Sequence, residues 1–124
     1  MPKDTICGIA TAPGAGGIAI VRVSGPLSRE ILEECFHPKC AQAFASRRMM
    51  YGYAVNSCGE ELDEVMAVFL AAPATYTRED MFEIQCHGGG VCARRVMERI
   101  IALGARIADP GEFTKRAFLN GRID

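Results

Sequence analysis

The sequence predicts a single α+β domain, in which a mixed sheet of five to six strands is covered by about three helices. Short runs with strand-like patterns recur along the chain, and apolar residues at helical spacing mark several of the segments between them. The two kinds of element do not alternate regularly enough for a doubly wound parallel sheet. Hydrophobic residues make up 49% of the 124 positions, which is typical of a globular domain, and no apolar run is long enough to cross a bilayer.

Two strands are expected at the start of the chain. Apolar runs at residues 5–10 and 18–24 flank the glycine-rich segment 12–17, a pattern that predicts two strands joined by a loop. In the second run, alternation places Arg22 on an otherwise apolar face. Because a charged group is costly to shield from water without a partner, Arg22 is expected to have one.

A helix and a hairpin are expected next. Pro26 precedes an apolar stripe at helical spacing, and this helix should end near residues 37–38. Runs at residues 48–55 and 62–71 then flank a turn at residues 56–59, which is typical of a β-hairpin. The second run is apolar on both faces, so it should be a central strand.

The following segment predicts a strand, a helix and a further short strand. After a loop at residues 72–79, the run at residues 81–87 alternates, which places three polar side chains on one face: Glu83, Gln85 and His87. Three glycines then open a helix over about residues 91–103, which Gly104 ends. A short strand is expected at residues 105–108.

The closing segment, DPGEFTKRAFLNGRID, predicts a short capped helix that holds Arg122 just beyond its end. It lies in a basic stretch, because residues 85–124 carry seven cations against four carboxylates, whereas residues 56–84 carry one cation against seven carboxylates. This asymmetry suits a partner or an anionic ligand, and solvated surface charges account for it equally well. A nucleic-acid module is disfavoured, because the chain is nearly neutral and has no Trp.

The six cysteines are expected to be reduced thiols in a cytoplasmic protein, because no signal peptide opens the sequence and an ordinary apolar core is available. Cys35, His37 and Cys40 could be read as part of a zinc site. No CxxC pair accompanies them, and the sequence contains one other histidine, so no metal site is predicted.

Two classes of active site are excluded or disfavoured by the motifs. No glycine cluster continues into the Lys-Ser or Lys-Thr of a phosphate-binding loop, so these residues cannot hydrolyse a nucleoside triphosphate by that route. His87 lies at a strand end before a helix N-terminus, where an imidazole could be catalytic or could shape the turn. No nucleophile is recognisable beside it, and no catalytic residue is predicted.

Three separated segments resemble the N-terminal domain of the MnmE (TrmE) family of tRNA-modification GTPases: DTICGIATAPGAGGIAIVRVSGP, APATYTREDMFEIQCHGGG and the closing segment. They occur in the family's order and spacing and cover nearly the whole chain. The resemblance implies a folate-binding half-unit that is also seen in glycine-cleavage aminomethyltransferases, and two copies that pair as a homodimer. It also implies that these residues are a fragment, without the family's helical and GTPase domains.

The resemblance further implies a tetrahydrofolate derivative as cofactor, either 5-formyl- or 5,10-methylene-tetrahydrofolate. The family's ligand positions fall on Arg22, Glu83 and Arg122, with Glu83 orienting the pterin and the arginines holding anionic or carbonyl groups. A carboxylate suits the pterin's fork of donors, and guanidinium groups suit the carboxylates of the glutamate tail. The chemistry alone also allows Arg22 and Glu83 to be a structural ion pair.

For the full-length protein, the resemblance implies GTP hydrolysis with Mg and K in the GTPase domain. It also implies work with the flavoprotein MnmG (GidA) on C5 of the wobble uridine of tRNA. By this resemblance, three residues depart from the family's pattern. Arg78 stands where the family has a glycine, Ala15 where it often has an arginine, and Arg122 where many members have a lysine. The alternatives are an interaction module without folate binding and a stand-alone aminomethyltransferase, and the second lacks an evident general base.

Overall fold

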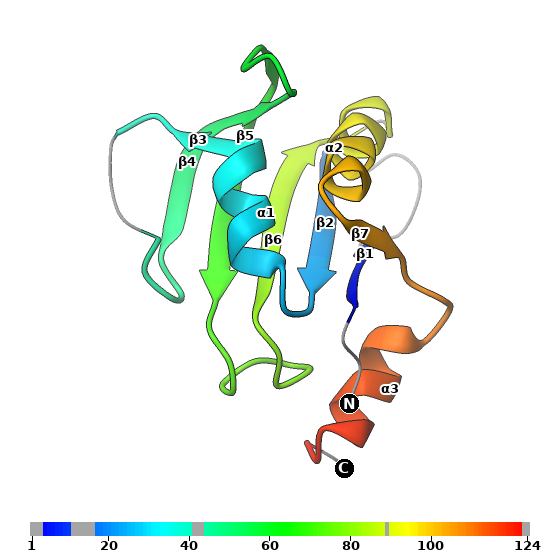
Figure 1. Cartoon of the computed structure of the whole chain (residues 1–124). Coiled ribbons are helices and arrows are strands. Elements are labelled where there is room, and N and C mark those ends of the chain that lie inside the picture. Colours follow the sequence, from blue (N-terminus) through cyan, green and yellow to red (C-terminus); the bar gives the residue numbers. More distant parts are fainter. Residues whose placement is uncertain (1–3, 11–16, 41–43, 89, 123–124) are drawn as a thin grey trace.

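The structure is a computed structural model that describes residues 4–10, 17–40, 44–88 and 90–122. One sheet runs in the order β3-β4-β5-β6-β2-β1-β7, and helices α1 and α2 cover one of its faces (Figure 1). The strands are β1 (Thr5–Ile9), β2 (Ile18–Ser24), β3 (Phe36–Pro38), β4 (Met49–Val55), β5 (Glu61–Leu70), β6 (Met81–His87) and β7 (Ala105–Ile107). The helices are α1 (Ser28–Cys35), α2 (Val91–Ala102) and α3 (Glu112–Leu119).

The predicted α+β class and the mixed sheet are confirmed. Strands β1 and β7 are parallel, whereas the other neighbouring strands are antiparallel. The described residues form seven strands, one more than the five to six expected, and three helices. Strand β5 lies inside the sheet between β4 and β6, as its apolar pattern predicts. Among the described residues, no helix is long and apolar enough to cross a membrane.

The additional strand is β3, which occupies the end of the segment where a longer helix was expected. Helix α1 ends at Cys35, and Phe36 is already extended, with φ −133° and ψ 129°. Pro38 disfavours helical geometry at the residue before it and is tolerated on an edge strand. β3 also needs Gly52 opposite Pro38, because a Cβ at Gly52 would lie 2.2 Å from the carbonyl oxygen of His37.

Alternation along the strands separates a buried face from a more accessible one. In β6, Phe82, Ile84 and Cys86 pack beneath α1 and α2 in the main core, whereas Glu83 and Gln85 point to the other side. Each fully buried apolar side chain contributes about 1.5–3 kcal/mol, so this core fixes the register of the sheet. We call the side of β4, β5, β6 and β2 opposite α1 and α2 the open face.

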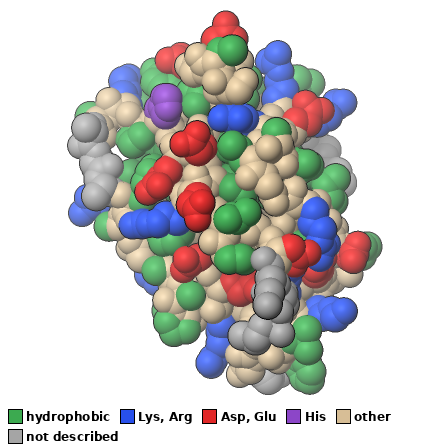
Figure 2. Space-filling view, viewed as in Figure 1, with side chains coloured by type: hydrophobic (Ala, Val, Ile, Leu, Met, Phe, Trp, Pro, Cys, Tyr) green, Lys and Arg blue, Asp and Glu red, His purple; other side chains and the backbone are tan. Residues whose placement is uncertain are grey.

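The exposed side of α1 is a solvated, acidic surface. Figure 2 views this side and shows carboxylates gathered over α1, whose exposed residues include Glu30, Glu33 and Glu34. None of these three forms an ion pair with another described residue, so their charges are solvated. The open face is where the polar strand residues meet, and it carries the candidate site.

Candidate functional site

Arg22 and Glu83 face each other on the open face. Strands β2 and β6 are antiparallel, and their register places Arg22 directly opposite Glu83. Arg22 Nε and Nη2 each lie 2.8 Å from Glu83 Oε2, so Glu83 is the partner that the sequence predicts for Arg22. The Arg22 side chain is 32% exposed and that of Glu83 is 19% exposed, so a ligand in solution can reach the pair.

The pair keeps a hydrogen-bond acceptor available. Both contacts use Glu83 Oε2, and Oε1 accepts no hydrogen bond from the described residues. An ionised carboxylate can accept on both oxygens, so this group still has acceptor capacity toward a ligand. A partly exposed ion pair contributes only about 0–1 kcal/mol to stability. The domain should therefore fold almost as stably without this pair.

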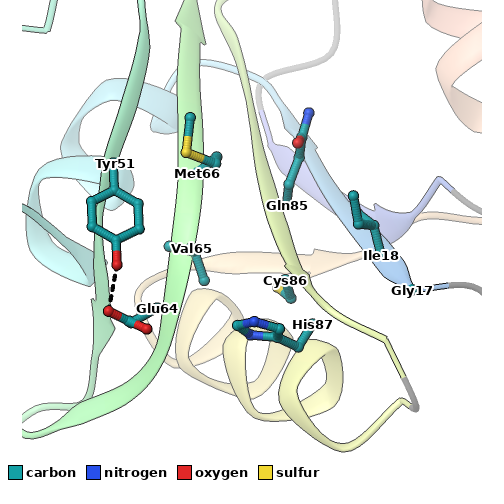
Figure 3. Close-up of a pocket in the computed structure, with 9 residues that line it drawn as sticks. All are labelled: Gly17, Ile18, Tyr51, Glu64, Val65, Met66, Gln85, Cys86 and His87. Atoms are coloured by element: carbon teal, nitrogen blue, oxygen red, sulfur yellow. Dashed lines mark hydrogen bonds between the residues drawn. The ribbon is translucent and has the colours of Figure 1, made fainter.

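A hollow of about 230 Å³ lies beyond the pair, toward the His87 end of β6 (Figure 3). Its lining residues come from β4, β5, β6 and the start of β2: Gly17, Ile18, Tyr51, Glu64, Val65, Met66, Gln85, Cys86 and His87. In Figure 3 the hydroxyl of Tyr51 points to Glu64, to which it donates a hydrogen bond. This hydrogen bond to Glu64 raises the pKa of Tyr51 to about 12, so the phenol stays protonated at neutral pH.

His87 is held by an acid on the neighbouring strand. Its Nδ1 lies 2.8 Å from Asp63 Oδ1, and its backbone N–H donates to Asp63 Oδ2 at 3.1 Å. The nearby Cys92 thiol has its pKa raised, first by burial and then by Asp63, so it is not activated as a nucleophile. This arrangement supports the structural interpretation of His87, in which the side chain shapes the turn between β6 and α2.

A second hollow, of about 380 Å³, lies where the loop after β5 meets the segment before β4 and the end of α3. Three cations line it, Arg47, Arg78 and Arg122, and we call it the arginine pocket. The other lining residues are Leu70, Pro73, Ala74, Thr75 and Tyr76. Arg122 places its guanidinium 4.8 Å from the centre of the Tyr76 ring, a cation–π contact.

The three predicted ligand residues therefore divide between two places. Arg22 and Glu83 form the pair on the open face, whereas Arg122 stacks on Tyr76 in the arginine pocket. Leu70 in the pocket follows Val68 on the same side of β5, and Val68 pairs with Glu83. One two-residue step along a strand spans about 7 Å, so the pair and the pocket are neighbours on one surface.

The resemblance predicts a glycine at the position of Arg78, and the structure shows how the loop accommodates an arginine there. Arg78 takes a φ of 65°, a left-handed conformation that favours glycine. The loop therefore keeps a glycine-like backbone and adds a charged side chain to the pocket. Ala15, another departure, lies outside the described residues, as does most of the glycine-rich loop.

Helix α3 is fixed by a buried charge network that the sequence analysis did not find. Arg116 is 1% exposed and donates to the backbone oxygen of Asp4 at 2.7 Å, to Glu79 at 3.2 Å and to Glu112 at 3.3 Å. Glu112 also pairs with Arg106. The four-residue spacing of Glu112 and Arg116 could have indicated their contact from the sequence. Asp4 lies 112 residues from Arg116, and no sequence pattern indicates that contact.

The end of α3 is attached directly to the loop of the arginine pocket. Asn120 Nδ2 donates to the carbonyl oxygen of Thr77 at 2.8 Å, and the hydroxyls of Tyr76 and Thr114 lie 3.0 Å apart. The backbone N–H of Arg122 donates to Ala117 at 2.8 Å. These contacts place Arg122 just beyond the helix, as the closing segment predicts.

All six cysteines carry free thiols. Burial raises the pKa of Cys7 to about 11 and that of Cys35 and Cys86 to about 12. In the described part of the chain, no three His, Cys, Asp or Glu side chains are grouped so that they could hold a metal ion.

The mixed sheet has one open face, which carries an arginine–carboxylate pair beside an arginine pocket. The sequence contains no phosphate-binding loop. Together these are the features of a ligand-binding domain. The chain belongs to the family described as GTP-binding protein TrmE N-terminus, whose model matches residues 5–122. It is 54% identical to the tRNA modification GTPase MnmE of Geobacter sulfurreducens over 98% of the chain and 27% of that relative. For the proteins of the same name from Roseiflexus castenholzii and Chloroflexus aurantiacus, the identities are 51% and 50%, over 100% and 98% of the chain and 27% of each relative. The chain thus spans about a quarter of the length of these curated relatives.

Proposed function

We propose that this chain is the N-terminal domain of a tRNA-modification GTPase, and that it binds a tetrahydrofolate derivative and forms a homodimer. Family membership and the names of the relatives support the first part. The folate part rests chiefly on one observation, the accessible Arg22–Glu83 pair with an unused acceptor on Glu83. Its position beside the arginine pocket supplies cations for the anionic end of the same ligand.

The residues fit the chemistry of a reduced folate. The pterin presents a ring N–H and an exocyclic amine, which together match the carboxylate of Glu83. Arg22 holds that carboxylate in place, and Arg122 attracts the carboxylates of the glutamate tail. When bound, 5-formyl- or 5,10-methylene-tetrahydrofolate supplies a one-carbon unit, and these residues orient and retain it.

In the whole protein, we assign GTP hydrolysis with Mg and K to a separate GTPase domain, because the 124 residues contain no phosphate-binding loop. We further propose a role in modifying C5 of the wobble uridine of tRNA together with MnmG in the cytoplasm. The relatives' name, tRNA modification GTPase, supports the tRNA part of this role. This domain's part in that work is to hold the folate. No residue of the chain is assigned a catalytic role.

The homodimer is proposed to form against the open face. A second copy that helps to build the folate pocket has to approach Arg22 and Glu83. Exposed apolar side chains are available around them, since Ile18 is 56% exposed, Met49 44% and Tyr51 41%. Large apolar groups left accessible beside a polar site are typical of an interaction surface.

Replacing Glu83 by Gln tests the folate assignment. The amide retains the size of the side chain, but it replaces an acceptor by a donor that would face the pterin's own donors. We expect the affinity for 5-formyltetrahydrofolate to fall about ten- to hundred-fold, as for a lost charge-assisted hydrogen bond. The free energy of unfolding should fall by less than about 1 kcal/mol, because the ion pair is partly exposed. Calorimetric titration and thermal melting of both proteins measure the two quantities.

The second candidate function is an interaction module that forms the dimer without binding folate, and the ion pair seen between Arg22 and Glu83 favours it. On that interpretation, Glu83→Gln lowers the melting temperature and the wild-type chain shows no folate binding. Glu33→Gln is the control, because Glu33 is an exposed carboxylate on α1, on the side of the sheet opposite the open face. A loss of stability in Glu83→Gln with unchanged folate affinity would show that Glu83 is not the pterin anchor.

A further inference from the structure

The arginine pocket gathers positive charge that the fold does not neutralise. Arg47, Arg78 and Arg122 line one hollow, and none of them forms an ion pair with a carboxylate of the described residues. By contrast, the cations that fasten α3, Arg106 and Arg116, each contact two or more carboxylates. Three uncompensated guanidinium groups around a cavity attract an anion with several charges.

Two of these guanidinium groups are held in position before any ligand binds. Arg47 donates from Nη2 to the carbonyl oxygen of Ala74, and its backbone N–H donates to Phe69 at 2.8 Å. Arg122 rests on the ring of Tyr76, whose hydroxyl is in turn 3.0 Å from Thr114. Such preorganisation lowers the entropy lost on binding, and most of the donors of both arginines have no partner in the described chain.

The backbone at the pocket is strained. Among the described residues, two other than glycine have positive φ, Arg47 at 68° and Arg78 at 65°, and both line the pocket. A left-handed conformation is unfavourable for arginine, and such strain persists where the surroundings impose it, commonly at functional sites. This coincidence points to the two arginines as site residues.

The pocket's position and charge identify the ligand, given the proposed function, on which this inference rests. The pocket lies one strand step from the Arg22–Glu83 pair on the same surface, so the tail of a folate anchored at Glu83 can extend toward it. A folate with one glutamate carries two carboxylates, whereas each further γ-linked glutamate adds one. We propose that the arginine pocket binds a γ-linked oligoglutamate tail, so that this chain prefers polyglutamylated to monoglutamylated folate.

Comparing 5-formyltetrahydrofolate with one and with three glutamates tests this preference. By calorimetry at about 50 mM salt, where exposed charges are weakly screened, we expect the triglutamate to bind about tenfold more tightly. Arg78→Gly should reduce this ratio toward one, because it should weaken triglutamate binding more than monoglutamate binding. The same variant should melt at a higher temperature, because glycine relieves the positive φ. Arg47→Gln should also reduce the ratio, and Arg95→Gln, an exposed cation on α2, should not.

A tetra-γ-glutamate peptide without a pterin separates the pocket from the folate proposal. We expect weak, salt-sensitive binding that Arg47→Gln and Arg78→Gly diminish and Glu83→Gln does not. If the peptide binds and monoglutamyl folate does not, the result supports oligoglutamate binding in the arginine pocket and rejects the proposed folate site at Glu83. Equal affinity for the two folates together with no peptide binding would overturn the inference, even if monoglutamyl folate binds. A short RNA oligonucleotide that binds where the peptide does not would likewise overturn it, because the pocket would then serve phosphates.

Discussion

Burial divides the cysteines into reactive and protected groups. Cys40 and Cys58 are exposed, whereas Cys7, Cys35 and Cys86 are buried and their pKa values are raised to about 11 or 12. We expect iodoacetamide at pH 8 to label Cys40 and Cys58 at least about tenfold faster than the three buried thiols, because the thiolate is the reacting species. Peptide mass spectrometry over a time course measures these rates, with denatured protein as the control. Fast labelling of Cys35 in the native protein would contradict the described core.

Single residues also show how far the sequence could predict the site. Arg22 required a partner because of its place in an alternating strand, and the same pattern in β6 put Glu83 on the open face. The site role of Arg122 came from family resemblance, and its stacking on Tyr76 depends on a tertiary contact. Arg47 was not predicted to be near Arg122, because 75 positions separate them and no pattern in either loop indicates the contact.

At the scale of an element, α3 is held to the sheet by charges that titrate in acid. Hydrogen bonds from Arg106, with a smaller contribution from Arg116, lower the pKa of Glu112 from its usual 4.5 to about 2. The same two arginines lower the pKa of Asp4. Because the folded pKa of Glu112 is lowered, its stabilisation is complete above pH 4.5 and is lost as the pH falls from 4.5 toward 2.

We therefore expect Glu112→Gln to lower the free energy of unfolding at pH 7 by about 1.5–3 kcal/mol, the usual range for hydrogen bonds to charged groups. The variant should also lose less stability than wild type between pH 4.5 and 2. Urea denaturation across that range checks both expectations. Glu33→Gln on the exposed side of α1 is the control and should follow wild type. Parallel curves for wild type and Glu112→Gln would show that the network does not stabilise α3.

Elements defined by local pattern were predicted well, and those defined by distant contacts were not. β2, β6 and α2 have clear alternation or helical spacing, and the structure contains all three. β3 has three residues, too few for any period to show, and its pairing depends on the absence of a side chain at Gly52. The closing helix was predicted from its caps, but the attachment of that helix to Asp4 and Glu79 was not.

At the scale of the whole molecule, the proposed dimer makes the open face the surface that decides the state of association. We expect the chain to sediment as a dimer at tens of micromolar, roughly the range for a moderate interface. Ile18→Glu should shift it to monomer, because a charge would be buried against the second copy. Ile107→Glu, at a similarly exposed apolar position on the edge strand β7, should leave the dimer intact. A monomer for the wild-type chain, with folate present, would contradict the proposed dimer.

The Arg116 contacts also bear on the order in which the chain can mature during synthesis. Arg116 is made more than a hundred residues after Asp4, and their hydrogen bonds join two segments that are far apart in the chain. Until α3 emerges, Asp4 and Glu79 lack this cation, and the Phe113 ring of α3 is not yet beside Gly8 of β1. Domains generally fold as units as they emerge, and contacts this distant in sequence form slowly. The nascent domain therefore stays open at this end, and within reach of chaperones, until nearly all of its residues have been translated.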